Sequence, residues 1–191
     1  LDNIPSHYFM RYLYKYPQAA FPYDQLLEEN KTRTALDEEY EILDTGVFND
    51  NNYFDVDICY AKYDKTDIGI RITVKNRSKN TAPLTILPTL WFYNRWQYGG
   101  FNNKPLMERI DEKSIHVKHE RAGEYFFYFK DADDRLLTEN ETNFQKLFGL
   151  PNSSEFLKDA FHEAIIGNKN LKALQEKKEG TKFSAVYHLP I

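Results

Sequence analysis

Apolar and polar residues alternate with a period of two through several stretches of the chain, a pattern typical of β-strands. The alternation is most regular in residues 53–63 and 67–75, and the short polar segment between these stretches predicts a hairpin. Residues 113–118 and 125–130 predict another hairpin, and residues 181–191 alternate again. Several strands at hairpin spacing predict a mainly β protein with the fold of an antiparallel β-sandwich.

The stretch 84–98 holds both tryptophans and is the strand around which we expect the other strands to gather. Alternate positions from Leu84 to Phe92 carry apolar residues, and the opposite face carries Trp91 among others. Because both faces are bulky, we expect this strand to be covered on both sides. Residues 94–100 then leave the strand as a polar and aromatic loop that ends in two glycines.

Other stretches have the spacing of helices or of a further strand. Residues 7–16 predict a short helix, and residues 23–31 predict one or two helical turns with Asp24 as a candidate N-cap. Residues 40–48 resume strand character and are expected to pair across the Asn-rich turn with the strand that follows.

A short helical insertion is expected near residues 138–167. Its first helix would start with a capping box at residues 138–141 and end at Gly149. Its second helix would start at residue 153 or 154 and end near residue 167. Four residues at helical spacing predict its buried stripe: Leu157, Ala160, Phe161 and Ala164.

Length and charge fit one domain over residues 1–191. The formal net charge of −4 gives no basic surface of the kind that binds nucleic acid or anionic membranes, so neither partner is expected. No stretch has the apolar length of a membrane span. A single cysteine, Cys59, favours a cytoplasmic protein and is expected to be buried in its strand. The chain starts at Leu1 within a pattern and without Met, which suggests an excised fragment of something longer.

No self-contained catalytic site is visible, and we expect no cofactor and no metal. The Asp and Asn residues between Asp44 and Asp57 offer oxygen ligands, yet turn formation explains them better than calcium. His116 and His119 are three residues apart on a predicted strand, so their rings would lie on opposite faces. An independent metal-dependent enzyme, with its metal on the acidic cluster, is therefore a weak rival interpretation.

The loop after the predicted central strand allows two interpretations. Its aromatic rings and amide donors would suit a sugar, whose apolar face stacks on aromatic residues. The same residue types are enriched at protein interfaces. Together with polar residues of the predicted insertion, they form our set of candidate residues for a substrate cleft or a domain interface: Asn94, Arg95, Trp96, Tyr98, Lys158, Asp159 and His162.

Four passages of the sequence together resemble one family. The passages are 14–23, 43–48 with 53–55, 87–92 with Asn94 and Trp96, and 139–143 with 147–149. They are similar to the N-terminal β-domain of glycoside hydrolase family 63-like proteins, the mannosyl-oligosaccharide glucosidase group. The likeness spans most of the chain and continues through residues 158–159 and 180–182.

The resemblance implies a supersandwich-like domain that precedes an (α/α)6 barrel, where the barrel carries the carboxylates of an inverting glycosidase. The 191 residues do not include that barrel, so no catalytic residue is carried over, and the chain alone is expected to be inactive. Its expected role is to pack on the barrel of the same parent chain and to wall part of the substrate cleft, with an oligosaccharide as a further partner. The alternative is a stand-alone carbohydrate-binding module.

Overall fold

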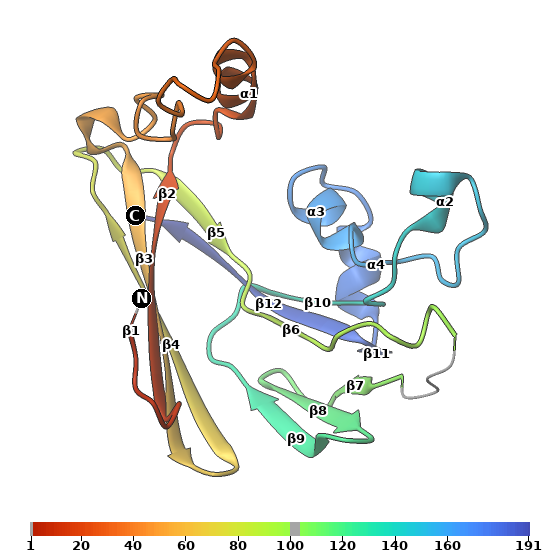
Figure 1. The fold of residues 1–191 in the computed structure, drawn as a ribbon. Coiled ribbons are helices and arrows are strands. Elements are labelled where there is room, and N and C mark those ends of the chain that lie inside the picture. The colour runs from red at the N-terminus through yellow and green to blue at the C-terminus, as the bar shows by residue number, and fades with distance from the viewer. Residues whose placement is uncertain (1, 100–103) are drawn as a thin grey trace. The chain divides into compact units, whose positions relative to one another are not determined.

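The computed structural model describes residues 2–99 and 104–191 (Figure 1). The chain divides into two compact units. Unit 1 contains the residues up to Leu84 together with Pro190 and Ile191, and unit 2 runs from Thr85 to Leu189. The expectation of one domain over residues 1–191 stays a prediction. Gly100, the second of the two loop glycines, lies outside the described residues.

Unit 1 is built on a four-stranded antiparallel sheet. Its strands follow one another in the order β1 (Asp2–Asn3), β2 (Phe9–Pro17), β3 (Tyr53–Asp64) and β4 (Asp67–Asn76). The predicted hairpin of β3 and β4 is confirmed, with Val56 opposite Val74 and Ile58 opposite Ile72.

Two predictions about this sheet were wrong. Residues 7–16 form no helix, because their large side chains alternate with a period of two and their backbone pairs along β3 as strand β2. Residues 40–48 form turns instead of a strand: Gly46 has a φ of 72°, and the Asp44 carboxylate accepts a hydrogen bond from the backbone N–H of Glu41. The 3-10 helix η1 (Asn49–Asn51) follows these turns.

The two faces of this sheet differ in chemistry. One face, hereafter the apolar sheet face, consists of the in-register residues Met10, Tyr12, Tyr14, Tyr16, Phe54, Val56, Ile58, Tyr60, Ile70, Ile72 and Val74. The opposite face carries ion pairs, with Asp55 between Lys15 (2.8 Å) and Arg77 (2.5 Å). The sheet is therefore amphipathic across its thickness.

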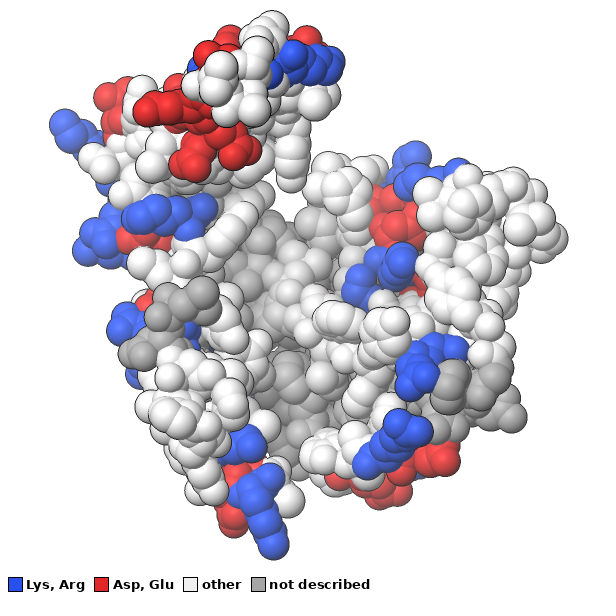
Figure 2. Space-filling model, in the orientation of Figure 1, with Lys and Arg blue, Asp and Glu red and all other residues white. Residues whose placement is uncertain are grey.

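The predicted helix over residues 23–31 is confirmed as α1 (Tyr23–Lys31). Its N-cap is Pro22 and not Asp24, which lies in the first turn, where a negative charge favours the helix dipole. Acidic side chains gather over α1 and the loop that follows it (Figure 2).

The remaining strands form two four-stranded sheets. In the first, β12 (Lys182–Pro190) pairs with β10 (Asp134–Thr138), β5 (Pro83–Ile86) and β6 (Thr89–Trp91). The second sheet has the order β11 (Glu179–Gly180), β7 (Leu106–Arg109), β8 (Ser114–His119) and β9 (Gly123–Tyr128). The predicted hairpin of β8 and β9 and the predicted final strand β12 are confirmed, whereas β7 and β10 were missed.

The central strand is β12 and not the stretch 84–98. That stretch is two short strands, β5 and β6, separated at Leu87 and Pro88, because a proline cannot donate to a strand ladder. Trp91 is 56% exposed and Tyr93 is 77% exposed, so the expected cover on both faces is absent.

The two sheets of this part of the chain pack face to face. Met107, Ile115 and Val117 of β7 and β8 meet Leu137, Phe183 and Ala185 of β10 and β12 in one buried cluster. Buried side chains from both sheets form one core, as in a β-sandwich. The predicted fold class, a mainly β antiparallel sandwich, is therefore confirmed.

Short helices cover the outer face of the first sheet. Leu136 and Val186 point away from the sandwich core and pack against α3 (Ala160–Ile165) and α4 (Leu171–Glu176). The predicted stripe of Leu157, Ala160, Phe161 and Ala164 is buried, as expected.

The helical insertion is confirmed, but its boundaries are later than predicted. Thr138 ends strand β10, and the first helix is α2 (Phe144–Phe148) with Asn143 as its N-cap, whose Oδ1 accepts a hydrogen bond from the N–H of Lys146 (3.0 Å). The helix ends as predicted at Gly149, whose φ of 69° favours glycine. The second helix, α3, starts only at Ala160.

Two smaller expectations can also be compared with the structure. Cys59 is buried, as predicted, and its Sγ lies 3.2 Å from Oδ1 of Asp57. None of the helices in residues 2–99 and 104–191 is both long enough and apolar enough to cross a membrane.

The sandwich core gives a matched test of stability. Phe183 is fully buried in the sandwich core, whereas Phe126 on β9 is 55% exposed. We expect Phe183→Ala to lower the free energy of unfolding by about 3–5 kcal/mol, because truncation leaves a cavity. Phe126→Ala should lower the free energy of unfolding by less than half as much as Phe183→Ala. Urea unfolding followed by tryptophan fluorescence measures both, and equal losses would contradict this core assignment.

Candidate functional site

The loop after β6 is fixed to residues 139–143 by side-chain amides. Asn94 holds Gln97: its Nδ2 donates to Oε1 of Gln97 (2.9 Å), and its Oδ1 accepts from the backbone N–H of Gln97 (3.2 Å). Gln97 in turn donates to the carbonyl of Thr142 (3.0 Å) and accepts from its N–H (2.7 Å). Both segments are therefore joined through backbone groups as well as side chains.

A buried carboxylate lies at the centre of this junction. Oε1 of Glu141 accepts hydrogen bonds from Nε1 of Trp96 (2.9 Å) and from Nζ of Lys104 (3.0 Å). The other oxygen accepts from the hydroxyl of Ser153. Glu141 is only 3% exposed, so these three donors replace the water that the carboxylate loses on folding.

These contacts keep both Glu141 and Lys104 charged. Burial by itself would raise the pKa of the Glu141 carboxyl, but the hydrogen bonds from Ser153, Lys104 and Trp96 outweigh burial and hold the pKa below its usual value. Burial would lower the pKa of Lys104, and its bonds to Glu141 and Glu139 instead raise it. A carboxylate held in its ionised form is not suited to act as a general acid.

The neighbouring residues continue the network. Glu139 accepts from Lys104 (3.1 Å) and from the hydroxyl of Thr181 (2.9 Å). That hydroxyl accepts from the N–H of Asn140 (2.7 Å), and Nδ2 of Asn140 donates to the carbonyl of Phe92 (2.8 Å). We refer to residues 139–143 and the side chains bonded to them as the polar hub.

The structure brings most of the predicted site residues to this hub. Tyr98 and Lys158 contact the hydroxyl of Thr142 at 3.0 Å and 3.1 Å. Asp159 accepts hydrogen bonds from Nδ2 of Asn143 (3.1 Å) and Nζ of Lys146 (3.4 Å). With Asn94 and Trp96, these residues converge from the loop and the insertion.

Arg95 and His162 lie exposed on the same two segments. Glu141, Lys104, Gln97 and Ser153 belong to the site but were not predicted from the sequence as site residues. The signal that could have found Glu141 is a pair of acidic residues, spaced by one position, directly after an apolar strand. Buried carboxylates need hydrogen-bond donors from other segments, which a sequence pattern does not place.

An apolar surface lies beside the hub. The α2 patch, as we call it, consists of Tyr98, Phe144, Leu147, Phe148 and Leu150. The rings of Tyr98 and Phe144 are 6.2 Å apart, and those of Phe144 and Phe148 are 5.8 Å apart. Tyr98, Leu147 and Phe148 are 65%, 62% and 65% exposed, and the surface over α2 carries few charges in Figure 2.

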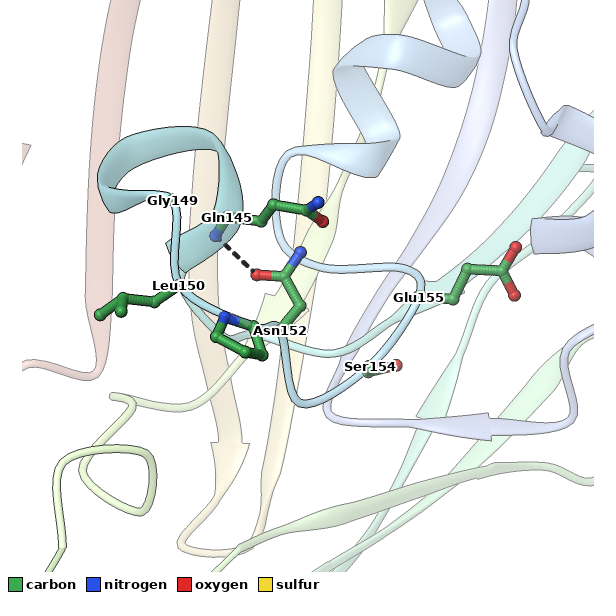
Figure 3. Close-up of a pocket in the computed structure, with 7 residues that line it drawn as sticks. Gln145, Gly149, Leu150, Asn152, Ser154 and Glu155 are labelled. Atoms are coloured by element: carbon green, nitrogen blue, oxygen red, sulfur yellow. Dashed lines mark hydrogen bonds between the residues drawn. The ribbon is translucent and has the colours of Figure 1, made fainter.

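A shallow depression of about 600 Å³ adjoins this patch between α2 and the loop that follows it (Figure 3). Asn152 fixes its wall, because Oδ1 accepts from the backbone N–H of Gln145 (3.0 Å) and Nδ2 donates to Asn143 (3.0 Å). The side chains of Leu150, Ser154 and Glu155 complete the lining. The depression mixes apolar and polar groups and contains no pair of catalytic carboxylates.

Among the residues that the structure describes, no three His, Cys, Asp or Glu side chains lie close enough to hold a metal. The rings of His116 and His119 stack on Phe126 and Phe92, respectively. Within the acidic cluster of unit 1, Asp44 caps a turn, in keeping with the turn interpretation, whereas Asp55 lies in strand β3 and is ion-paired.

Comparison with known proteins gives one informative match. A Saccharomyces cerevisiae protein, named uncharacterized protein YMR196W, is 38% identical over 98% of this chain. The chain spans about a fifth of the length of that relative, since the match covers 20% of it. No family model matches the chain. No solved structure matches it either.

The polar hub predicts an acid-induced transition. Because the folded pKa of Glu141 lies below its ordinary value of 4.5, the ionised carboxylate stabilises the fold above that pH, and this stability is lost as the pH falls through the folded pKa. We therefore expect the loop to loosen progressively as the pH falls below 4.5 and through the folded pKa. The emission of Trp96, measured in a Trp91→Phe variant, should shift to longer wavelength.

The control for this transition is Glu141→Gln, which cannot titrate. It should lose about 1–3 kcal/mol of stability at neutral pH, because donors of the hub lose a charged acceptor. Its tryptophan emission should no longer change as the pH falls below 4.5. A transition of the same size in this variant would contradict the role of Glu141.

Proposed function

We propose that the chain is the non-catalytic N-terminal β-domain of a larger glycoside hydrolase of the family 63 type. In this proposal the α2 patch packs on the catalytic (α/α)6 domain of the same parent chain, and the loop fixed by the polar hub walls part of the substrate cleft. The exposed α2 patch is the observation that carries the proposal, because contiguous apolar surface of this kind marks interaction sites.

The polar groups of the hub form hydrogen bonds and ion pairs within the hub, which supports a structural role rather than a catalytic one. Lys104 and Trp96 both bond to Glu141 within the hub, so these contacts hold the loop in place. Beside the hub, the surface carries the exposed ring of Tyr98 and the exposed apolar side chains of α2. Aromatic and aliphatic anchors on a rigid support are typical of the centre of an interface.

The length relation to the yeast protein is compatible with this role. The matched segment makes up 20% of that relative, so four-fifths of its length lies outside the match and leaves room for a further domain. The family assignment itself rests on the sequence resemblance, in particular on residues 87–92 and 139–143, which contribute β6 and the polar hub.

Variants of the α2 patch test the proposal in the full-length parent protein. We expect Tyr98→Ala and Phe148→Ala each to lower kcat/KM for gluco-oligosaccharides by about tenfold, the effect of roughly 1.4 kcal/mol at the interface or cleft wall. Phe126→Ala, which removes an exposed ring elsewhere in unit 2, should leave the activity unchanged. Unchanged activity and unchanged protease resistance in both patch variants would rule out the docking role.

A stand-alone carbohydrate-binding module is the second candidate, favoured by Tyr98 and the adjoining depression. Isothermal titration of the isolated chain with gluco- and manno-oligosaccharides separates the two functions. A domain that only packs on a barrel should neither bind nor hydrolyse these sugars. Saturable binding that Tyr98→Ala abolishes would instead establish the module.

A further inference from the structure

We propose that the apolar sheet face of unit 1 is a self-association surface, on which the same face of a second copy of this chain packs. This inference concerns unit 1 and does not rest on the proposed function, which uses the α2 patch of unit 2. It starts from the register of β2, β3 and β4, which places the apolar residues of all three strands on one side.

Much of this face is in contact with solvent, although Phe54 at one end of it is buried. Tyr14 is 54% exposed and Ile70 is 46% exposed, although they lie on different strands of the same face. A sheet face of aromatic and β-branched residues is normally covered by another layer. Water contact over such a face is unfavourable, so a covering layer would be stabilised by the hydrophobic effect.

The opposite side of the sheet cannot serve the same purpose. It carries ion pairs, since Asp57 pairs with Arg11 (2.6 Å) and Asp55 with Lys15 and Arg77. A docking layer on that side would have to desolvate these ion pairs, which is costly. Unit 1 therefore has one side suited to an apolar partner.

The chemistry of the face fits a second copy of itself. The residues that form it carry no charge, and Lys62, which continues the same parity, lies at the hairpin end of β3, opposite Ile68. In a twofold-symmetric dimer whose facing strands run antiparallel, Lys62 of each copy would lie beside the end of the other copy's sheet that contains Asn76. The two Lys62 side chains would therefore lie far from each other. Two faces of this kind can pack at the usual spacing of about 10 Å between sheets.

The size of the face sets the expected affinity. Three strands about 4.8 Å apart and seven residues of about 3.3 Å each give a flat area of roughly 300 Å², and side-chain relief increases it. A symmetric pair would thus bury roughly 600–1,200 Å² in total, the low end of specific interfaces. Association should therefore be reversible, with a dissociation constant in the micromolar range, roughly 1–100 μM.

Sedimentation equilibrium of the 191-residue chain tests the proposal, with matched substitutions on β4. The unchanged chain should pass from monomer to dimer as its concentration rises through that range. Ile70→Lys, on the apolar sheet face, should weaken dimerisation at least about tenfold, because it buries a charge in an apolar contact. Thr73→Lys, exposed on the opposite face of the same strand, should leave the dimerisation unchanged.

Two further variants keep the result unambiguous. Tyr14→Lys repeats the test from strand β2 and should also give a monomer, with the far-ultraviolet circular dichroism of the unchanged chain. Phe148→Lys changes the α2 patch and should not affect the dimer. A chain that stays monomeric at about 500 μM, or a dimer lost equally in Thr73→Lys or Phe148→Lys, would overturn the proposal. Monomers whose tyrosine fluorescence responds to oligosaccharides would assign the face to sugars instead.

Discussion

Unit 2 depends on one strand that is hydrogen-bonded along both edges and packed on both faces. Strand β12 pairs with β10 on one side and with β5 and β6 on the other. Phe183 and Ala185 point into the core between the sheets, while Val186 points to the cover of α3 and α4. Because the period of a strand is two, a shift of the register by one residue would exchange these faces. The pairing of β12 therefore fixes both layers at once.

The polar hub is directly connected to the strands of unit 2. Thr138 is the last residue of β10, and the carbonyl of Thr138 accepts from the N–H of Thr181 (3.0 Å), so residues 139–143 start from a fixed point. Gly180 lies so close that a Cβ atom there would be 2.6 Å from that carbonyl oxygen. Burial of the Glu141 carboxylate requires hydrogen-bond donors in place of water. Because Trp96 is one of these donors, its bond to Glu141 fixes the loop after β6.

Periodicity predicted the fold well where strands alternate without interruption. The hairpins of β3 with β4 and of β8 with β9 follow directly from this pattern, as does β12. It failed for residues 9–17, where tyrosines fit both a helix face and a strand face, and the partner strand β3 decides the outcome. Pro88 shows the converse, since one residue without an N–H divides an otherwise continuous apolar stretch into β5 and β6.

The candidate residues were predicted from their residue types. Their roles depend on contacts between residues about 45 positions apart in the sequence. Trp96 suggested a sugar platform, yet its indole N–H is occupied by Glu141 in the structure. Tyr98 kept its exposed ring, and only its hydroxyl is used, by Thr142. A pattern in sequence reports which groups are present, whereas burial and partner choice depend on segments that meet only in the folded chain.

The position of Asn140 has a further consequence for how this chain can be modified. Asn140, Glu141 and Thr142 read as an N-glycosylation sequon, an Asn followed two positions later by Thr. In the folded protein Nδ2 of Asn140 donates to the carbonyl of Phe92, and the residue is buried. A glycan on that nitrogen would have to occupy the space of the hub, so the folded domain excludes oligosaccharyl transfer at this site, and a chain glycosylated there before folding could not close the loop over residues 139–143.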